Sequence, residues 1–122
     1  MPPWQDAPER RDPGTGERDV MAEPLTRQEI EERIADLPGW STDGRKIEAA
    51  YSIPHIQGAA FVMHIAAIQD DLGHHSNATL GYKTVTLTIS SSDLGGRVAE
   101  HDVELARRIV AIAPAHGAEP VR

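Results

Sequence analysis

The sequence predicts an α+β domain in two layers, an antiparallel sheet covered on one face by helices. Three observations predict this fold class. Apolar residues recur at helical spacing in three segments, they alternate with polar residues in a segment that opens at Thr79, and Asp43-Gly44 separates two short apolar-containing runs. The predicted order is α-β-β-α-β-α, for which a meander-type sheet with helices on one face is the economical arrangement.

The first predicted helix begins at a capping box. Thr26 precedes Glu29 by three residues, the spacing at which each side chain can bond the backbone of the other. Apolar residues then follow at helical spacing: Ile30, Ile34 and Leu37. Pro38-Gly39 ends this helix.

A hairpin and a second helix follow. Asp43-Gly44 is a two-residue turn signal between strands predicted at Trp40 to Thr42 and at Arg45 to Ile53. Pro54 suits the first turn of the second helix, and Gly73 suits its end. One continuous apolar stripe runs along this helix: Phe61, Ile65, Ile68 and Leu72.

The clearest predicted strand runs from Thr79 to Ser91. One of its faces is rich in threonine, whereas Val85, Leu87 and Ile89 lie on the other. We expect this strand near a sheet edge, where it could pair with a second subunit. After a Gly95-Gly96 turn, the last helix turns five small or branched apolar residues inward and ends at Pro114.

The domain organisation follows from these signals. Residues 1–22 are rich in proline, glycine and charge and are expected to form a disordered extension, within which Met21 is an alternative start. Residues 23–114 form a single domain, and residues 115–122 are expected to be a flexible tail. The sequence contains no internal repeat.

Composition argues against several classes of function. The formal net charge of −7 disfavours a nucleic-acid surface, and no window is long or apolar enough to cross a membrane. Cysteine is absent, so a disulfide framework and a thiolate metal site are excluded. These features fit a cytoplasmic protein.

The adjacent histidines His74 and His75 are the most informative residues. They follow Gly73 at a predicted helix-to-strand corner, where side chains can leave the core and converge on a small molecule. Imidazole titrates near neutral pH, so two of them suggest proton transfer. A solvated polar loop is the alternative for an isolated pair. No third ligand has metal-site spacing to the pair, so no metal is expected.

Further residues surround this pair in a fixed order. Asp70 precedes His74 by four residues, and Tyr82, Val85, Gly95-Gly96 and Asp102 follow. With the Leu37-Pro38-Gly39-Trp40 turn and Phe61, this ordered set resembles the pterin-4a-carbinolamine dehydratase family, also known as the dimerisation cofactor of a homeodomain factor. The resemblance covers residues 25–113.

The chain also departs from the family pattern. Ser76 stands where the family has proline, and Ser92 stands where it has a third histidine. A serine hydroxyl cannot act as a base near pH 7. One extra residue between Gly96 and Asp102 brings in His101, which could replace the missing imidazole or simply be a polar residue of the helix's first turns.

The resemblance implies a pterin substrate, no cofactor and a dehydration. Water leaves the 4a-hydroxy group of a tetrahydropterin, which requires an acid for the departing hydroxyl and a base near N5. By resemblance, His74 contributes to binding and polarisation, His75 is the favoured general acid/base, and Asp70 orients them.

Three further positions are implied as substrate-binding. Asp102 would support the pocket wall, and Ser92 would hold a water or bond the substrate. Trp40 would be a plug in the core or at the pocket rim. The resemblance also implies a homodimer or homotetramer.

Two other functions stay open at this point. The chain could be a non-catalytic binding protein, a dimerisation cofactor or a Rubisco assembly factor-like protein with a protein partner, because loss of the third histidine permits such a change. It could also be a related dehydratase or cyclase with a substrate other than a pterin. Fold alone does not decide among them.

Overall fold

The computed structural model describes residues 23–121, except for the side chain of Asp93. The predicted extension over residues 1–22 lies outside the described residues. The elements in chain order are α3 (Arg27–Ile34), β1 (Ser41–Thr42), β2 (Ile47–Ser52), α4 (His55–Leu72), β3 (Asn77–Leu80), β4 (Thr84–Ile89), the 3-10 helix η1 (Ser92–Leu94), α5 (Glu100–His116) and β5 (Glu119–Pro120).

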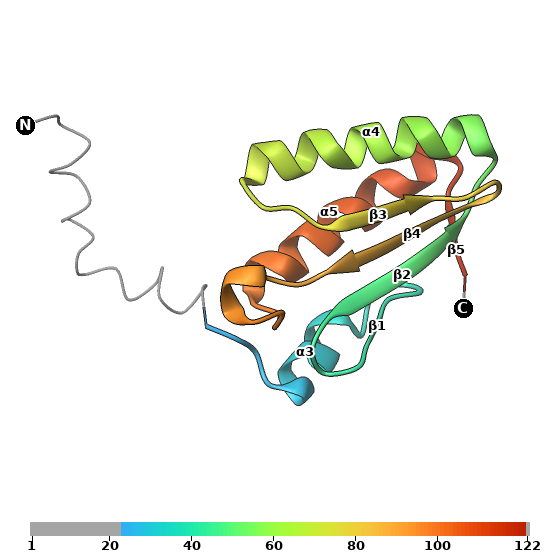
Figure 1. Ribbon diagram of the computed structural model, residues 1–122. Coiled ribbons are helices and arrows are strands. Elements are labelled where there is room, and N and C mark those ends of the chain that lie inside the picture. The colour runs from blue at the N-terminus through green and yellow to red at the C-terminus, as the bar shows by residue number, and fades with distance from the viewer. Residues whose placement is uncertain (1–22, 122) are drawn as a thin grey trace, which may run out of the picture.

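The strands form one antiparallel sheet in the order β1-β2-β4-β3, with β5 beside β2. Helices α4 and α5 lie along the same side of this sheet (Figure 1). Alternate residues of β4 point into the space between sheet and helices, and all three are fully buried: Val85, Leu87 and Ile89. The predicted α+β class with two layers is therefore confirmed.

The structure differs from the prediction of one strand over Thr79 to Ser91. Two strands, β3 and β4, form a hairpin in which the Gly81 N–H donates to the Thr84 carbonyl at 2.8 Å. Glycine suits this turn, because a Cβ on Gly81 would lie 2.6 Å from Thr84 Oγ1 and would force that side chain to move. As a result β4 lies between β2 and β3, and β3 is the edge strand rather than the predicted long strand.

The first hairpin is present, but its predicted two-residue turn is wrong. Thr42 pairs with Ile47, so residues 43–46 form a longer connection. Asp43 Oδ1 accepts hydrogen bonds from the backbone N–H groups of Arg45 at 2.9 Å and Lys46 at 3.1 Å. These bonds lower the pKa of Asp43. They also supply acceptors for two backbone N–H groups that in a two-residue turn would have bonded across the hairpin.

The C-terminus also differs from the prediction. Helix α5 continues through Pro114 to His116 and ends where Gly117 adopts a φ of 75°. A proline in the last turn removes one backbone donor without stopping the helix, whereas a left-handed glycine does stop it. Ala118 is buried, and β5 pairs with β2, so the segment predicted as a flexible tail contributes to the sheet.

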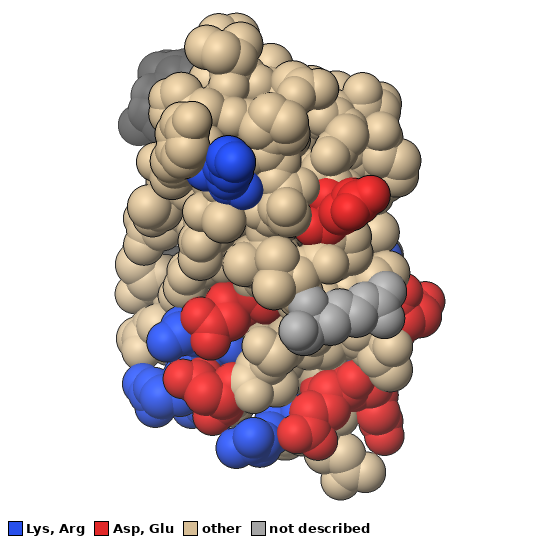
Figure 2. Space-filling model, turned by 90° about the vertical axis from the view of Figure 1, so that its right-hand side faces the viewer, with Lys and Arg blue, Asp and Glu red and all other residues tan. Residues whose placement is uncertain are grey.

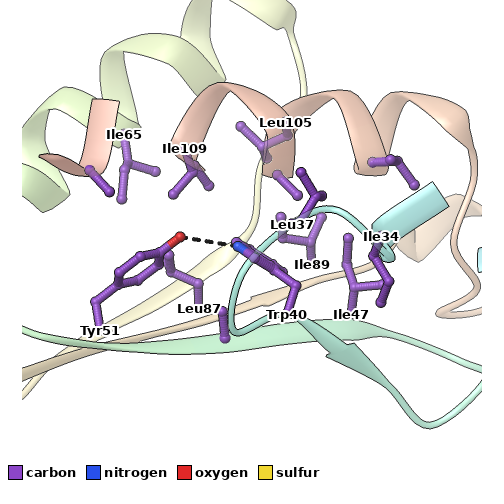
Figure 3. Close-up of a cluster of buried hydrophobic side chains, with 14 of the residues drawn as sticks. Ile34, Leu37, Trp40, Ile47, Tyr51, Ile65, Leu87, Ile89, Leu105 and Ile109 are labelled. Atoms are coloured by element: carbon purple, nitrogen blue, oxygen red, sulfur yellow. Dashed lines mark hydrogen bonds between the residues drawn. The ribbon is translucent and has the colours of Figure 1, made fainter. Parts of the chain in front are cut away.

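The core lies between the sheet and the helices, as Figure 3 shows. Trp40 and Tyr51 are both buried there, and the Trp40 indole Nε1 donates to the Tyr51 hydroxyl at 3.1 Å. Burial raises the pKa of Tyr51, and the hydrogen bond from Trp40 acts in the opposite direction. Trp40 therefore takes the core position that was one of its two predicted roles.

Tyr51 makes stability sensitive to high pH. An unfolded tyrosine loses its proton at a pKa of about 10, whereas the folded Tyr51 loses it at a higher pKa. Its contribution to the free energy of unfolding is therefore complete below about pH 10 and is lost as the pH rises through the folded pKa. Tyr51→Phe is expected to reduce this alkaline loss in urea unfolding at increasing pH, whereas the exposed Tyr82→Phe retains it. Equal losses in both variants would contradict the assignment.

Charged side chains are unevenly distributed over the surface. On the face drawn in Figure 2, groups of both signs gather over the lower half, and the upper half carries few charged groups. The pair between Arg33 and Glu100, at 2.7 Å, links α3 to α5. Of the helices within residues 23–121, none has the length and apolarity needed to span a membrane.

Candidate functional site

The end of α4 creates the corner that holds the histidine pair. Gly73 adopts a φ of 67° and donates its N–H to the carbonyls of Asp70 and Gln69. The His74 N–H also donates to the Gln69 carbonyl, at 3.0 Å. This left-handed cap turns the chain from α4 into β3 within a few residues. The predicted helix-to-strand corner at His74 and His75 is confirmed.

The two histidine side chains have different surroundings. The His74 side chain is 16% exposed and contacts α5, whereas that of His75 is 68% exposed. His75 Nε2 lies 3.5 Å from the Asp70 carboxylate, which is itself 82% exposed. An ion pair between groups so accessible to water is weak, so Asp70 restrains His75 only loosely.

Asp102 is the buried carboxylate of the site. It lies in the first turn of α5 with no solvent exposure. One oxygen accepts from His74 Nε2, and the other accepts from the Ser91 hydroxyl and from the Ala99 N–H, each at 2.8 Å. Three donors from separate parts of the chain thus converge on one carboxylate, which fixes the orientation of the His74 ring.

Ser91 and His101 complete this cluster. Ser91 Oγ lies 2.9 Å from His101 Nε2, and the His101 ring meets the His74 ring edge to face with centroids 4.2 Å apart. Ser91 was missed as a site residue. Its position could have been inferred from the alternation of β4, because Ser91 follows Ile89 by two residues and so points inward, where it is buried.

A second set of side chains forms a polar cleft on the opposite face of the sheet. Its volume is about 210 Å³. The lining residues carry imidazole, amide and hydroxyl groups: His75, Ser76, Asn77, Thr88, Ser90 and Ser92. Thr88 and Ser90 have the parity opposite to Ser91, which places them away from the core, and Ser92 begins η1 directly after this segment. Such a lining offers hydrogen bonds to a small polar ligand.

The predicted site residues therefore fall into two groups. The structure brings His75 together with Ser92 at the cleft, with Asp70 beside His75. It brings His74 together with Asp102 in the buried cluster. The role of each residue in chemistry stays a prediction.

Trp40 and Ser76 make contacts that the sequence did not predict. Trp40 is bonded to Tyr51 in the core and does not line the cleft. Ser76, at the position of the family's proline, accepts a hydrogen bond from the Gln69 side chain. This bond was not anticipated, and it ties the corner to the last turn of α4.

The buried cluster has a composition that can also hold a metal ion. His74, His101 and Asp102 each offer a ligand atom, and these atoms lie within 4.8 Å of one another. Two imidazoles and a carboxylate suit several transition metals. The same groups are bonded to one another and to Ser91, which favours a hydrogen-bond network over a metal centre. The sequence did not reveal this set, because His74 follows α4 whereas His101 and Asp102 lie in α5, far apart along the chain.

The whole domain matches a known family. The family model described as pterin 4 alpha carbinolamine dehydratase matches residues 23–112. The chain belongs to this family. The resemblance inferred from the histidine corner is thereby confirmed.

Relatives of the dehydratase family cover nearly the entire domain. A protein of Streptomyces avermitilis, provisionally named a pterin-4-alpha-carbinolamine dehydratase, is 52% identical over 100 residues, which are 81% of this chain and 99% of the relative. A protein of Roseiflexus sp. with the same provisional name is 37% identical over 90 residues, 73% of this chain and 96% of the relative.

Solved structures agree with this family fold. The transcriptional coactivator/pterin dehydratase from Brucella melitensis has a TM-score of 0.68 and 29% identity, and the match covers 75% of this chain and 99% of that one. A pterin dehydratase-like RuBisCO assembly factor of the alpha-carboxysome has a TM-score of 0.50 and 22% identity, covering 62% and 88%. The second likeness concerns the fold alone.

Proposed function

We propose that this chain is a lyase that dehydrates a pterin-4a-carbinolamine such as 4a-hydroxytetrahydrobiopterin. One observation carries the proposal. Two adjacent imidazoles occupy a single corner, His75 at a polar cleft and His74 held by the buried carboxylate of Asp102. Because the chain belongs to the dehydratase family, we infer that the substrate of this site is a pterin carbinolamine. A cytoplasmic location stays a prediction.

The reaction is a proton-assisted elimination. The C4a–O bond breaks, the hydroxyl leaves as water with a proton from a general acid, and a base removes the proton on N5 to give the quinonoid dihydropterin. The step needs no oxidant or reductant. Imidazoles suit both roles because they exchange protons near neutral pH.

His75 is the proposed general acid/base of this step. It lines the cleft and is accessible to solvent, so a bound substrate can reach it and water can restore its proton. Ser92 and its neighbours in the cleft would bind the polar edges of the heterocycle by hydrogen bonds. His74 and Asp102 would support the corner from the helix side.

The chain is further proposed to form a homodimer or homotetramer. All residues of the edge strand β3 are exposed, so its outer backbone groups are free for a partner strand. The outer face of α4 exposes the large apolar side chains of Ile56 and Met63, at 79% and 74%. Sedimentation as a monomer at all concentrations would contradict this proposal.

A binding role on the same scaffold is the second candidate. The observation that favours it is Ser92, because a hydroxyl lines the cleft where an imidazole is expected for full activity. Such a protein would bind a protein partner through the exposed sheet face without turnover.

A spectroscopic assay of carbinolamine dehydration separates these functions. We expect the wild type to exceed the spontaneous rate and His75→Ala to reduce kcat/KM by about 10²–10⁴-fold. His64→Ala is the matched control, because His64 is exposed on α4 and does not line the cleft. Ser92→His is expected to raise turnover by adding an imidazole to the cleft.

The assay has clear contrary outcomes. A wild type that does not exceed the spontaneous rate would refute the pterin dehydratase. If Ser92→His alone then gains activity, the chain has retained the cleft without its chemistry, and the binding role becomes the better description. If His75→Ala and His64→Ala both lose activity relative to the wild type, the loss would reflect impaired folding rather than catalysis.

A further inference from the structure

We propose that His101 is a positioning residue of this site, which acts through Ser91 and Asp102 to hold the His74 imidazole in one tautomer and one orientation. The inference rests on the proposed function, because it assigns a task within the same site. His101 does not line the cleft, so it is not expected to touch the substrate.

The direction of each hydrogen bond follows from the number of protons available. The Ala99 N–H and the Ser91 hydroxyl both donate to Asp102 Oδ2, at 2.8 Å each. Ser91 has one hydroxyl proton, and that proton is used on Asp102. Towards His101 Nε2, at 2.9 Å, Ser91 can therefore only accept, so this nitrogen must carry a proton.

The same reasoning applies to His74. Its Nε2 faces the other oxygen of Asp102, which offers acceptors, so His74 Nε2 also carries a proton. In the neutral ring a proton on Nε2 leaves Nδ1 as the free acceptor. One buried carboxylate thus selects the same tautomer in both imidazoles, in one case directly and in the other through Ser91.

Packing fixes the plane of the His74 ring as well. The edge of one ring meets the face of the other at an interplanar angle of 72°, with centroids 4.2 Å apart. His101 and Asp102 are consecutive residues at the start of α5, so the helix backbone sets their separation. His74 is thereby held by a hydrogen bond on its Nε2 and by an edge-to-face contact with the His101 ring.

Loss of His101 should therefore make the His74 ring more mobile while the residues that line the cleft stay in place. The Ser91 hydroxyl would lose its donor and could rotate away from Asp102, and the His74 ring would lose the wall against which it packs. We expect a fall in kcat of about 10–100-fold, by analogy with the loss seen when a residue that orients a metal-binding histidine is removed, with little change in KM. The KM should stay near its value because the cleft itself is unchanged.

The deciding measurement is ¹⁵N NMR of the imidazole nitrogens, combined with the dehydration assay. In the wild type, His74 is expected to show one protonated nitrogen, Nε2. His101→Ala and Ser91→Ala are each expected to give a mixture of His74 tautomers. His64→Ala is the matched control, because it removes an imidazole that bonds His116 at 2.9 Å, outside this cluster.

This measurement does not depend on turnover, so the two proposals can fail separately. A His74 tautomer that changes in both cluster variants supports the positioning role even if the wild type fails to dehydrate pterins. A His74 spectrum unchanged in both His101→Ala and Ser91→Ala would overturn it, whatever the wild-type rate. The double variant should lose no more kcat than His101→Ala alone, because His101→Ala already removes both the ring contact and the bond to Ser91. Losses that multiply would also overturn it.

Discussion

Asp102→Ala is expected to lower the free energy of unfolding by about 3–5 kcal/mol, because three donors would lose their acceptor and each unsatisfied buried donor costs about 1–3 kcal/mol. Alanine would leave the donors on His74, Ser91 and Ala99 in a buried space without their acceptor. The first turn of α5 would also lose an acidic group that its dipole favours. Urea unfolding followed by circular dichroism measures the loss.

Two further variants serve as controls for the stability loss in Asp102→Ala. Asp102→Asn retains one carbonyl acceptor and nearly the same shape, so its loss should be smaller than that of alanine. Asp71→Ala removes an exposed carboxylate and should change stability by less than about 0.5 kcal/mol. If Asp102→Ala unfolds with the same free energy as Asp71→Ala, the convergence of donors on this carboxylate does not stabilise the fold.

Phe61→Ala is expected to cost about 3–5 kcal/mol of unfolding free energy, as for other buried aromatic residues truncated to alanine. Phe61 is fully buried on α4. Its ring meets Tyr51 of β2 edge to face at 5.3 Å and lies 5.4 Å from the ring of His116 in α5. The single side chain thus joins one helix to the sheet and to the other helix, and its removal leaves a cavity where these elements meet.

Chemical or thermal unfolding of three variants tests the role of Phe61. Phe61→Leu fills most of the cavity and should lose less stability than Phe61→Ala. Met63→Ala, on the exposed side of α4, should remain close to the wild type. An equal loss in Phe61→Ala and Met63→Ala would mean that α4 is not attached to the sheet through its buried face.

Local signals predicted the start of α3 and both ends of α4, but α3 ends at Ile34, before the predicted stop at Pro38-Gly39, and α5 continues past Pro114. The capping box at Thr26 and Glu29 is present, with both reciprocal hydrogen bonds. Pro54 precedes α4 and Gly73 ends it, as expected from their backbone preferences. These signals depend on neighbouring residues along the chain, so one sequence suffices to find them.

The sheet was harder to predict because its order depends on contacts between distant segments. Alternation from Thr79 onward is the same whether the chain continues straight or folds back at Gly81. The Gly81 turn was therefore overlooked, and β4 was expected near an edge. The pairing of β5 with β2 involves Pro120, a residue that gives no strand signal of its own.

The site was predicted in the same uneven way. His74 and His75 were visible from their place between Gly73 and a strand pattern. Their separation into a buried and an exposed environment was not, because it depends on how α5 packs against the corner. Ser91 joins Asp102 only after the chain has folded, whereas the family resemblance pointed to Ser92, the position of the third histidine.

The position of Asp102 has a consequence for the history of this scaffold. The same carboxylate oxygen that accepts from Ser91 also accepts from the Ala99 N–H, and so closes the first turn of α5. Selection for a folded domain alone would then retain this aspartate in descendants whose imidazoles no longer perform chemistry. Among diverging copies we therefore expect the aspartate to persist even where the histidines have been replaced.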